Sequence, residues 1–328
     1  DAPGHVEFIK NMITGASQAE AAILIIKAEE GLQEQTKRHA YILSMLGLKQ
    51  LIVAVNVFDF DNFTQEKFNQ LNDEIVDFLG KIDLKPSYVI PISAKLGDNI
   101  ANKSEKIDWY SGDTVLNSLD TFALTKRNTD KGLRFPIQDA YKVEDKRIFA
   151  GRVESGVINK DDEVVVLPAN TKTTIASVEK FLEEPVKAEA GESIGITTKD
   201  PLFIERGNVV CKEDDMPKVT DTIKANVFWM SKQDFDADES ITLKLATQEV
   251  TANIEKIERR MNSSTLEEIQ RDDNLLKNNE VGVMVIKTNE PVIVDNFNYV
   301  PELGRFVFER DNITSAGGII TNIELEKI

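Results

Sequence analysis

Buried-strand and amphipathic-helix patterns alternate over the first 125 residues of the chain. Three short, continuous apolar runs are typical of strands buried in a parallel sheet. They are residues 21–26, 51–55 and 88–92. Between them, residues 35–48 and 63–78 carry apolar side chains at helical spacing, and the two helices are predicted to stop at Gly47 and Gly80. This alternation predicts an α/β unit that binds its ligand beyond the carboxyl ends of the strands.

From residue 131 onward, short strand-like segments separated by glycine-containing turns replace this alternation. Such spacing predicts small closed barrels. The expected strands are residues 149–153, 163–167, 193–198 and 208–211, then 223–230, 240–246, 249–257, 280–287 and 306–309. Residues 266–276 are predicted to form a short helical turn.

The predicted fold class is therefore multidomain α/β plus all-β, with a parallel sheet followed by two small β-barrels. The boundaries that we predict are a first domain at residues 1–128, a second at 129–216 and a third at 217–328. A length of 328 residues suits two or three domains.

Composition and charge narrow the function classes. A net charge of −17 argues against a broad phosphate-neutralising surface, so nucleic acid is not expected as the main ligand. The single cysteine, Cys211, excludes an internal disulfide and is expected to be a small buried side chain. The only histidines are His5 and His39, which excludes a histidine-rich metal site. No apolar run approaches the length of a membrane span and no signal peptide is visible, so we expect a cytoplasmic protein without a membrane partner.

Two polar motifs follow directly after predicted strands, where a ligand would lie. In Asn56-Val57-Phe58-Asp59, an amide and a carboxylate three residues apart are suited to reading guanine. The carboxylate of Asp59 accepts from the base nitrogens N1 and N2, and the Asn56 amide bridges to neighbouring loops. Buried polar pairs of this kind discriminate strongly, because the wrong base leaves them unpaired. The second motif, Ser93-Ala94-Lys95, offers backbone amides to the guanine O6.

A longer run at the start of the chain gives these motifs a context. Residues 1–17, Asp-Ala-Pro-Gly-His-Val-Glu-Phe-Ile-Lys-Asn-Met-Ile-Thr-Gly-Ala-Ser, closely resemble the third nucleotide motif and second switch of the translation-factor-like GTPases. By this resemblance Asp1 holds Mg²⁺ through water, Gly4 senses the γ-phosphate and His5 orients the hydrolytic water. Asn56, Asp59 and the loop of Ser93, Ala94 and Lys95 then hold the guanine base, which makes GTP and Mg²⁺ the expected cofactors.

The sequence of the predicted third domain indicates which branch of this family the chain resembles most. Residues 276–281, 301–307 and 316–320 resemble the large, GTP-hydrolysing subunit of bacterial sulfate adenylyltransferases. In that branch a small ATP-sulfurylase subunit joins ATP and sulfate into adenylyl sulfate, and GTP hydrolysis drives the reaction. The resemblance thus implies a heteromer with the small subunit, with the barrels carrying switch movement to it.

Two departures from the family pattern leave alternatives open. The family carries lysine where this chain has Val57, and the phosphate-loop motif Gly-x-x-x-x-Gly-Lys-Ser/Thr is absent from the sequence. Either the sequence is part of a longer protein, or the chain is a degenerate pseudo-GTPase acting as a non-catalytic interaction module. A translation elongation or release factor is a further alternative. We expect the polypeptide as written not to hydrolyse GTP.

Overall fold

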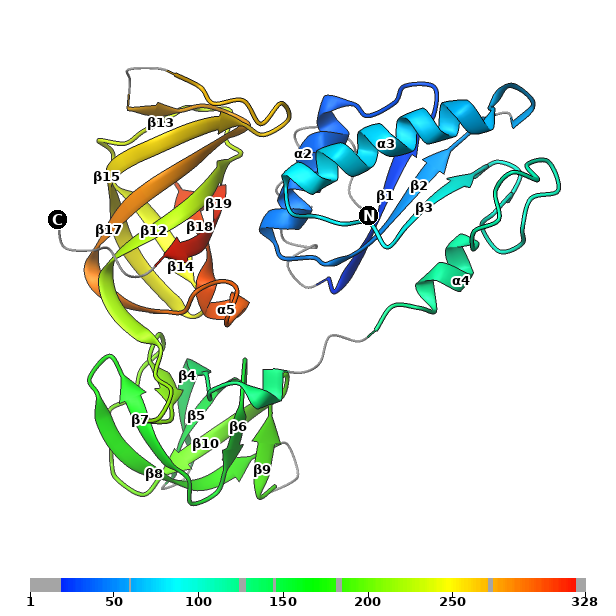
Figure 1. Cartoon of the computed structure of the whole chain (residues 1–328). Helices are drawn as coiled ribbons and strands as arrows, with labels where there is room; N and C mark the ends of the chain where they lie inside the picture. Colours follow the sequence, from blue (N-terminus) through cyan, green and yellow to red (C-terminus); the bar gives the residue numbers. More distant parts are fainter. Residues whose placement is uncertain are drawn as a thin grey trace. The chain divides into compact units, whose positions relative to one another are not determined.

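The computed structural model describes residues 19–58, 60–123, 128–143, 146–180, 185–270 and 274–322. The chain divides into two compact units, of which the first holds an α/β domain and the second holds two β-barrels. The predicted fold class is confirmed: a parallel sheet precedes two closed six-stranded barrels (Figure 1).

A three-stranded parallel sheet, in the order β1-β2-β3, organises the α/β domain. Its strands, all predicted from their apolar runs, are β1 (Ala21–Lys27), β2 (Gln50–Asn56) and β3 (Tyr88–Ile92). The central strand β2 is buried along almost its whole length, which explains why its sequence is continuously apolar rather than alternating. The helical elements of this domain are α2 (Glu34–Met45), η2 (Phe60–Asn62), α3 (Gln65–Lys81) and α4 (Val115–Leu119).

Helices α2 and α3 lie side by side (Figure 1), and the Ser44 hydroxyl near the end of α2 donates to the carbonyl of Ile82 at 2.6 Å. The Thr64 side chain caps α3 by accepting from the backbone N–H of Lys67. The predicted stop at Gly80 is wrong, because α3 continues through Gly80 to Lys81 and Ile82 is its C-terminal cap. Gly47, with a φ of +74°, does follow the end of α2.

The first barrel closes in the strand order β10-β5-β4-β11-β7-β8. A short two-stranded sheet of β6 and β9 accompanies it. The bounds in this part of the chain are η3 (Asn128–Asp130), β4 (Phe135–Val143), β5 (Lys146–Arg152), β6 (Val157–Asn159), β7 (Glu163–Leu167), β8 (Thr171–Glu179), β9 (Lys187–Glu189), β10 (Ser193–Thr198) and β11 (Val209–Cys211).

The second barrel closes in the order β12-β17-β15-β14-β18-β19, and β13 pairs with β16 beside it. The bounds are β12 (Lys218–Trp229), β13 (Phe235–Asp236), β14 (Ile241–Leu245), β15 (Gln248–Asn262), β16 (Leu275–Leu276), β17 (Glu280–Val294), α5 (Pro301–Gly304), β18 (Arg305–Arg310) and β19 (Ile313–Asn322).

The helical turn predicted at residues 266–276 is wrong for the residues that the structure describes. Leu266 has a φ of +61°, a left-handed conformation that a right-handed helix does not accommodate. Further along, Glu268 pairs with Met261 in an isolated bridge, and Leu275–Leu276 form β16. Leu276 serves barrel packing instead, since it is fully buried in the barrel core.

One apolar core joins the two barrels. Val165, Leu167, Val209 and Cys211 of the first barrel belong to the same cluster of buried residues as the interior of the second barrel. Cys211 is free and fully buried, as predicted, and burial raises the pKa of its thiol to about 12. The barrels therefore share packed side chains as well as a chain connection.

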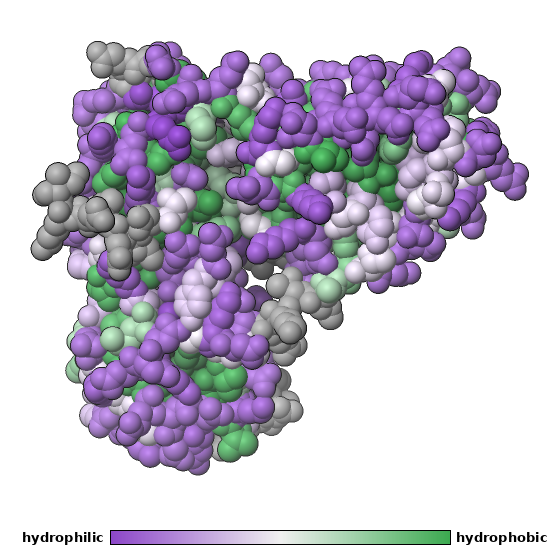
Figure 2. Space-filling model, viewed as in Figure 1, coloured by the Kyte–Doolittle hydropathy of each residue, from purple (hydrophilic) through white to green (hydrophobic). Residues whose placement is uncertain are grey.

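Hydrophilic residues cover most of the face shown in Figure 2, and hydrophobic residues gather there in small patches. Within the described residues, no helix is both long enough and apolar enough to cross a bilayer.

Candidate functional site

The three parallel strands end level with one another, which brings the predicted binding loops to one edge of the sheet. In the strand register Lys27 lies opposite Asn56, and Asn56 lies opposite Ile92. Asn56 and Ser93 therefore leave the carboxyl edge of the sheet from neighbouring strands. This is the edge at which open α/β sheets bind ligands.

Asn56 ties the loop after β2 to the loop after β3. Its Oδ1 atom accepts the backbone N–H of Ala94 at 2.9 Å, and the N–H of Val57 donates to the carbonyl of Ile92 at 2.8 Å. The two loops that the sequence singles out for guanine binding are thus held together by an amide side chain in the bridging position. The Nδ2 group of Asn56 lies at the same edge, at the end of β2.

The loop at residues 93–95 already uses two of its three backbone amides within the protein. The Ser93 N–H donates to the carbonyl of Asp98 at 3.1 Å, and the Ala94 N–H donates to Asn56. A guanine O6 that takes a hydrogen bond from this loop must therefore share the Ala94 N–H with Asn56 or use the N–H of Lys95. Ser93 is 1% exposed, and its hydroxyl has no hydrogen-bond partner among the residues that the structure describes.

The side chains of Val57 and Phe58 differ sharply in their exposure to solvent. The Val57 side chain is 2% exposed and belongs to the buried interior, whereas Phe58 is 68% exposed. The Phe58 N–H donates to Oε1 of Glu29 at 3.0 Å, which fixes the start of this loop against the loop after β1. The position that carries lysine in the family is thus occupied by a core side chain.

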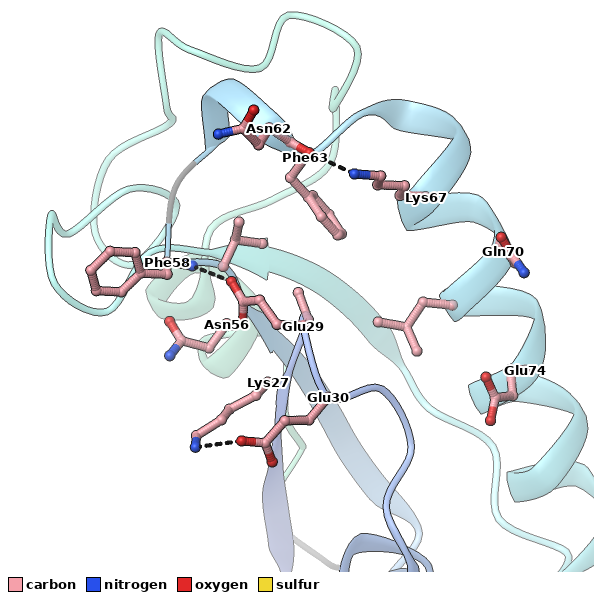
Figure 3. Close-up of a pocket in the computed structure, with 13 residues that line it drawn as sticks. Lys27, Glu29, Glu30, Asn56, Phe58, Asn62, Phe63, Lys67, Gln70 and Glu74 are labelled. Carbon is pink, nitrogen blue, oxygen red and sulfur yellow. Dashed lines mark hydrogen bonds and ion pairs between the residues drawn. The ribbon is translucent and has the colours of Figure 1, made fainter.

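A pocket of about 860 Å³ opens beside this edge (Figure 3). Val57, Phe63 and Leu71 supply buried apolar side chains to its wall. Its rim is charged: Lys27 and Glu30 form an ion pair at 2.8 Å, and the Lys67 ammonium donates to the carbonyl of Asn62 at 2.9 Å. An apolar floor with a few polar groups is typical of small-molecule sites.

Sequence reasoning missed the residues that β1 brings to this edge. Glu29 and Glu30 come shortly after an apolar strand, much as Asn56 ends one, and that signal could have identified them. Lys67 and Glu74 come from the exposed positions of α3, and nothing in a single sequence separates them from ordinary solvated helix residues.

Four predicted site residues, Asp1, Gly4, His5 and Asp59, lie outside the described residues. The structure therefore does not describe the arrangement of the predicted magnesium site. Within the described ranges, no group of three or more histidine, cysteine, aspartate or glutamate side chains could hold a metal ion. Of the residues predicted to hold guanine, the structure brings Asn56 and Ala94 together at the edge where the base is expected, and Val57 is the departure from the family pattern.

A parallel sheet with bridged loops at its carboxyl edge, followed by two closed barrels, defines a class: a nucleotide-binding domain with a tandem of β-barrels. Family comparisons give the same division. The profile described as "Elongation factor Tu GTP binding domain" matches residues 1–126, "Elongation factor Tu domain 2" matches residues 147–211, and "GTP-eEF1A C-terminal domain-like" matches residues 222–321.

Two groups of curated relatives match at similar identity. Elongation factor 1-alpha of Methanopyrus kandleri is 35% identical over 343 residues, covering 100% of this chain and 81% of the relative. Sulfate adenylyltransferase subunit 1 of Francisella tularensis subsp. tularensis (strain WY96-3418) is 34% identical over 323 residues, covering 98% of this chain and 68% of the relative. The crystal structure of sup35 complexed with GDP has the same fold, with a TM-score of 0.57, 22% identity and coverage of 94% of this chain and 80% of that one.

The chain belongs to the translation-factor-like GTPase family, the family of elongation factor Tu. The two relatives described above carry different names, elongation factor 1-alpha and sulfate adenylyltransferase subunit 1, at nearly equal identity.

Proposed function

We propose that this chain is the GTP-binding, GTP-hydrolysing subunit of a sulfate adenylyltransferase. In this function a small ATP-sulfurylase subunit joins ATP and sulfate into adenylyl sulfate, and GTP hydrolysis by the large subunit drives that unfavourable step. The polypeptide as written lacks the phosphate-loop motif, so we expect it not to hydrolyse GTP by itself. A cytoplasmic location accompanies the function.

The observation that carries the nucleotide part is the hydrogen bond from the Ala94 N–H to Asn56 Oδ1 at 2.9 Å. It holds the loops after β2 and β3 together at one edge of the sheet, which supports a guanine-reading site there. For the remaining predicted residues, we propose that Asp1 holds Mg²⁺ through water, that Gly4 senses the γ-phosphate and that His5 orients the hydrolytic water. Asp59 is proposed to accept hydrogen bonds from the guanine base.

Two features of the chain favour the sulfate branch. Residues 276–281, 301–307 and 316–320 resemble that subunit, and they fall on β16 and β17, on α5 and β18, and on β19 of the second barrel. A net charge of −17 is poorly suited to a surface that must neutralise RNA phosphates. Both features concern partner choice rather than nucleotide chemistry.

Complex formation tests this choice of partner. Sedimentation velocity of the chain mixed with a purified small ATP-sulfurylase subunit is expected to show a stoichiometric heteromer at micromolar concentration. The matched control replaces the present chain with bovine serum albumin, which is also acidic, in the same mixture with the small subunit. If the sedimentation coefficient of the small subunit is unchanged when the chain is present at tens of micromolar concentration, the proposed sulfate adenylyltransferase function is wrong.

A translation factor is the second candidate, favoured by the 35% identity to archaeal elongation factor 1-alpha and by the eEF1A-like profile over residues 222–321. Co-sedimentation with ribosomes, or binding of aminoacyl-tRNA that weakens steeply with salt, would support it. The non-catalytic module, suggested by Val57, predicts partner binding without a preference for guanine nucleotides.

A further inference from the structure

Phe58 is an exposed aromatic side chain at the ligand edge of the sheet. It is 68% exposed, and Figure 3 shows its ring directed away from α3, on the same side as the Asn56 amide. A single exposed aromatic residue is ordinary on a protein surface. This one differs because both its backbone and its ring are held.

Two contacts fix the position of Phe58. Its N–H donates to Glu29 Oε1 at 3.0 Å, which anchors the backbone to the loop after β1. The ammonium nitrogen of Lys95 lies 4.9 Å from the centroid of the ring, a cation–π contact. The ring and the cation come from the same two loops that the Asn56–Ala94 hydrogen bond joins.

The side chain of the preceding residue, Val57, is poorly placed to stack on a base. Val57 is 2% exposed and its side chain lies in the buried wall of the pocket, so it leaves almost no exposed surface on which a base could stack. The residue next along the chain presents a flat apolar face instead. With Lys95 at one side of the ring, a ring that remains largely exposed leaves area for a second planar group.

We propose that Phe58 is a base-stacking residue of the nucleotide site, with Lys95 holding its ring by the cation–π contact. The inference rests on the proposed function, because it assumes that a nucleotide occupies this edge. Stacking on an aromatic ring is tolerant of base identity, since every base has a π-face. Phe58 therefore supplies affinity for the purine ring, while polar groups such as Asn56 supply the choice among purines.

The test measures GDP and IDP affinities by isothermal titration calorimetry on the full chain and its variants. Phe58→Leu is expected to weaken both nucleotides about tenfold (about 1.4 kcal/mol) and by the same factor, leaving the GDP/IDP ratio unchanged. Lys95→Met, which keeps length and removes charge, is expected to weaken both about twofold to threefold. Phe203→Leu is the matched control: Phe203 is 86% exposed and also faces a cation, with the Arg147 guanidinium 4.9 Å from its ring, but it lies in the barrel unit.

Phe58→Trp adds a direct reading of stacking. The new indole is expected to be quenched by saturating GDP, with affinity within about twofold of the wild type, whereas Phe203→Trp fluorescence stays constant. The stacking role is overturned if Phe58→Leu binds GDP with unchanged affinity and the fluorescence of Phe58→Trp does not respond to GDP. If Asn56→Ala has a weakened GDP affinity in the same experiment, the nucleotide site itself still stands. If Asn56→Ala binds like the wild type, or the wild type does not bind GDP at millimolar concentration, the proposed site is wrong and the stacking role falls with it.

Discussion

At the scale of single residues, Glu154 has a strongly raised carboxyl pKa among the described residues of the barrels. Burial and the nearby Glu302 carboxylate raise its pKa to about 7, against an ordinary value of 4.5, and Arg152 and Arg305 only partly oppose this. The Arg152 Nε atom is 3.9 Å from a Glu154 oxygen, at the limit of an ion pair. Oε2 of Glu302 is buried and has no hydrogen-bond partner among the described residues. The Glu302 carboxylate thus disfavours ionisation of Glu154, and the two arginines compensate for it only in part.

This pair makes the free energy of unfolding depend on pH. Between pH 4.5 and 7 the folded chain holds a proton on Glu154 that the unfolded chain has lost, so stability falls as pH rises through this window. Glu154→Gln removes that dependence. We expect the variant to be about 1–3 kcal/mol more stable than the wild type at pH 8 and no more stable at pH 4, measured by urea unfolding. A wild type and variant with parallel pH profiles would contradict the assignment.

At the scale of elements, a buried arginine connects the two barrels. Arg134, just before β4, is fully buried, and its guanidinium makes two contacts to the Asp295 carboxylate, at 2.7 and 3.2 Å. It also donates to the Asp215 carboxylate at 3.1 Å and to the Asp215 backbone carbonyl at 2.7 Å. Tyr299 donates to the other oxygen of Asp215. Asp295 follows β17 of the second barrel, so this network joins the start of one barrel to the end of a long strand of the other. A single sequence gives no sign of it, because the partners are 81 and 161 residues apart.

Removing the arginine is expected to destabilise the barrel unit strongly. Arg134→Met leaves the Asp295 carboxylate, which is 6% exposed, without its counter-charge, and the loss should be about 3–5 kcal/mol in urea unfolding. Arg134→Lys is expected to recover only part of the loss, because an ammonium lacks the two-pronged geometry of the guanidinium. The double variant Arg134→Met, Asp295→Asn is the control, and it should be less destabilised than Arg134→Met alone. Full stability of Arg134→Met would show that the network does not hold the barrels.

Helix α3 provides a second test at the scale of elements. Gly80 is the penultimate residue of the helix, and an added Cβ would meet no atom within 4 Å beyond its chain neighbours and the backbone of its own helix. Gly80→Ala is therefore expected to raise the free energy of unfolding of the α/β domain by about 0.5–1 kcal/mol. Gly47→Ala is the matched control and should lower it, since Gly47 has a φ of +74°. Destabilisation by Gly80→Ala would indicate that the helix ends where the sequence pattern placed its stop.

At the scale of the whole molecule, the sequence predicted the architecture but not the contacts between distant elements. The strands β1, β2 and β3 were predictable because short continuous apolar runs between helical patterns are typical of a parallel sheet. The glycine at position 80 misled because a glycine marks a helix end only when its backbone is left-handed, and residues 266–276 misled because tertiary packing overrode helical spacing. At the site, the motifs placed Asn56 and Ala94 at one edge, whereas the Phe58–Lys95 contact and the Glu29 anchor needed the fold.

We propose that the carboxyl edge of this sheet binds guanine in preference to other bases. The most direct measurement compares GDP with ADP by isothermal titration calorimetry, for the wild type and for Asn56→Ala. We predict that the wild type prefers GDP to ADP by at least about tenfold and that Asn56→Ala loses most of that preference, because the bridge to Ala94 is gone. Equal affinity of the wild type for GDP and ADP would contradict the claim.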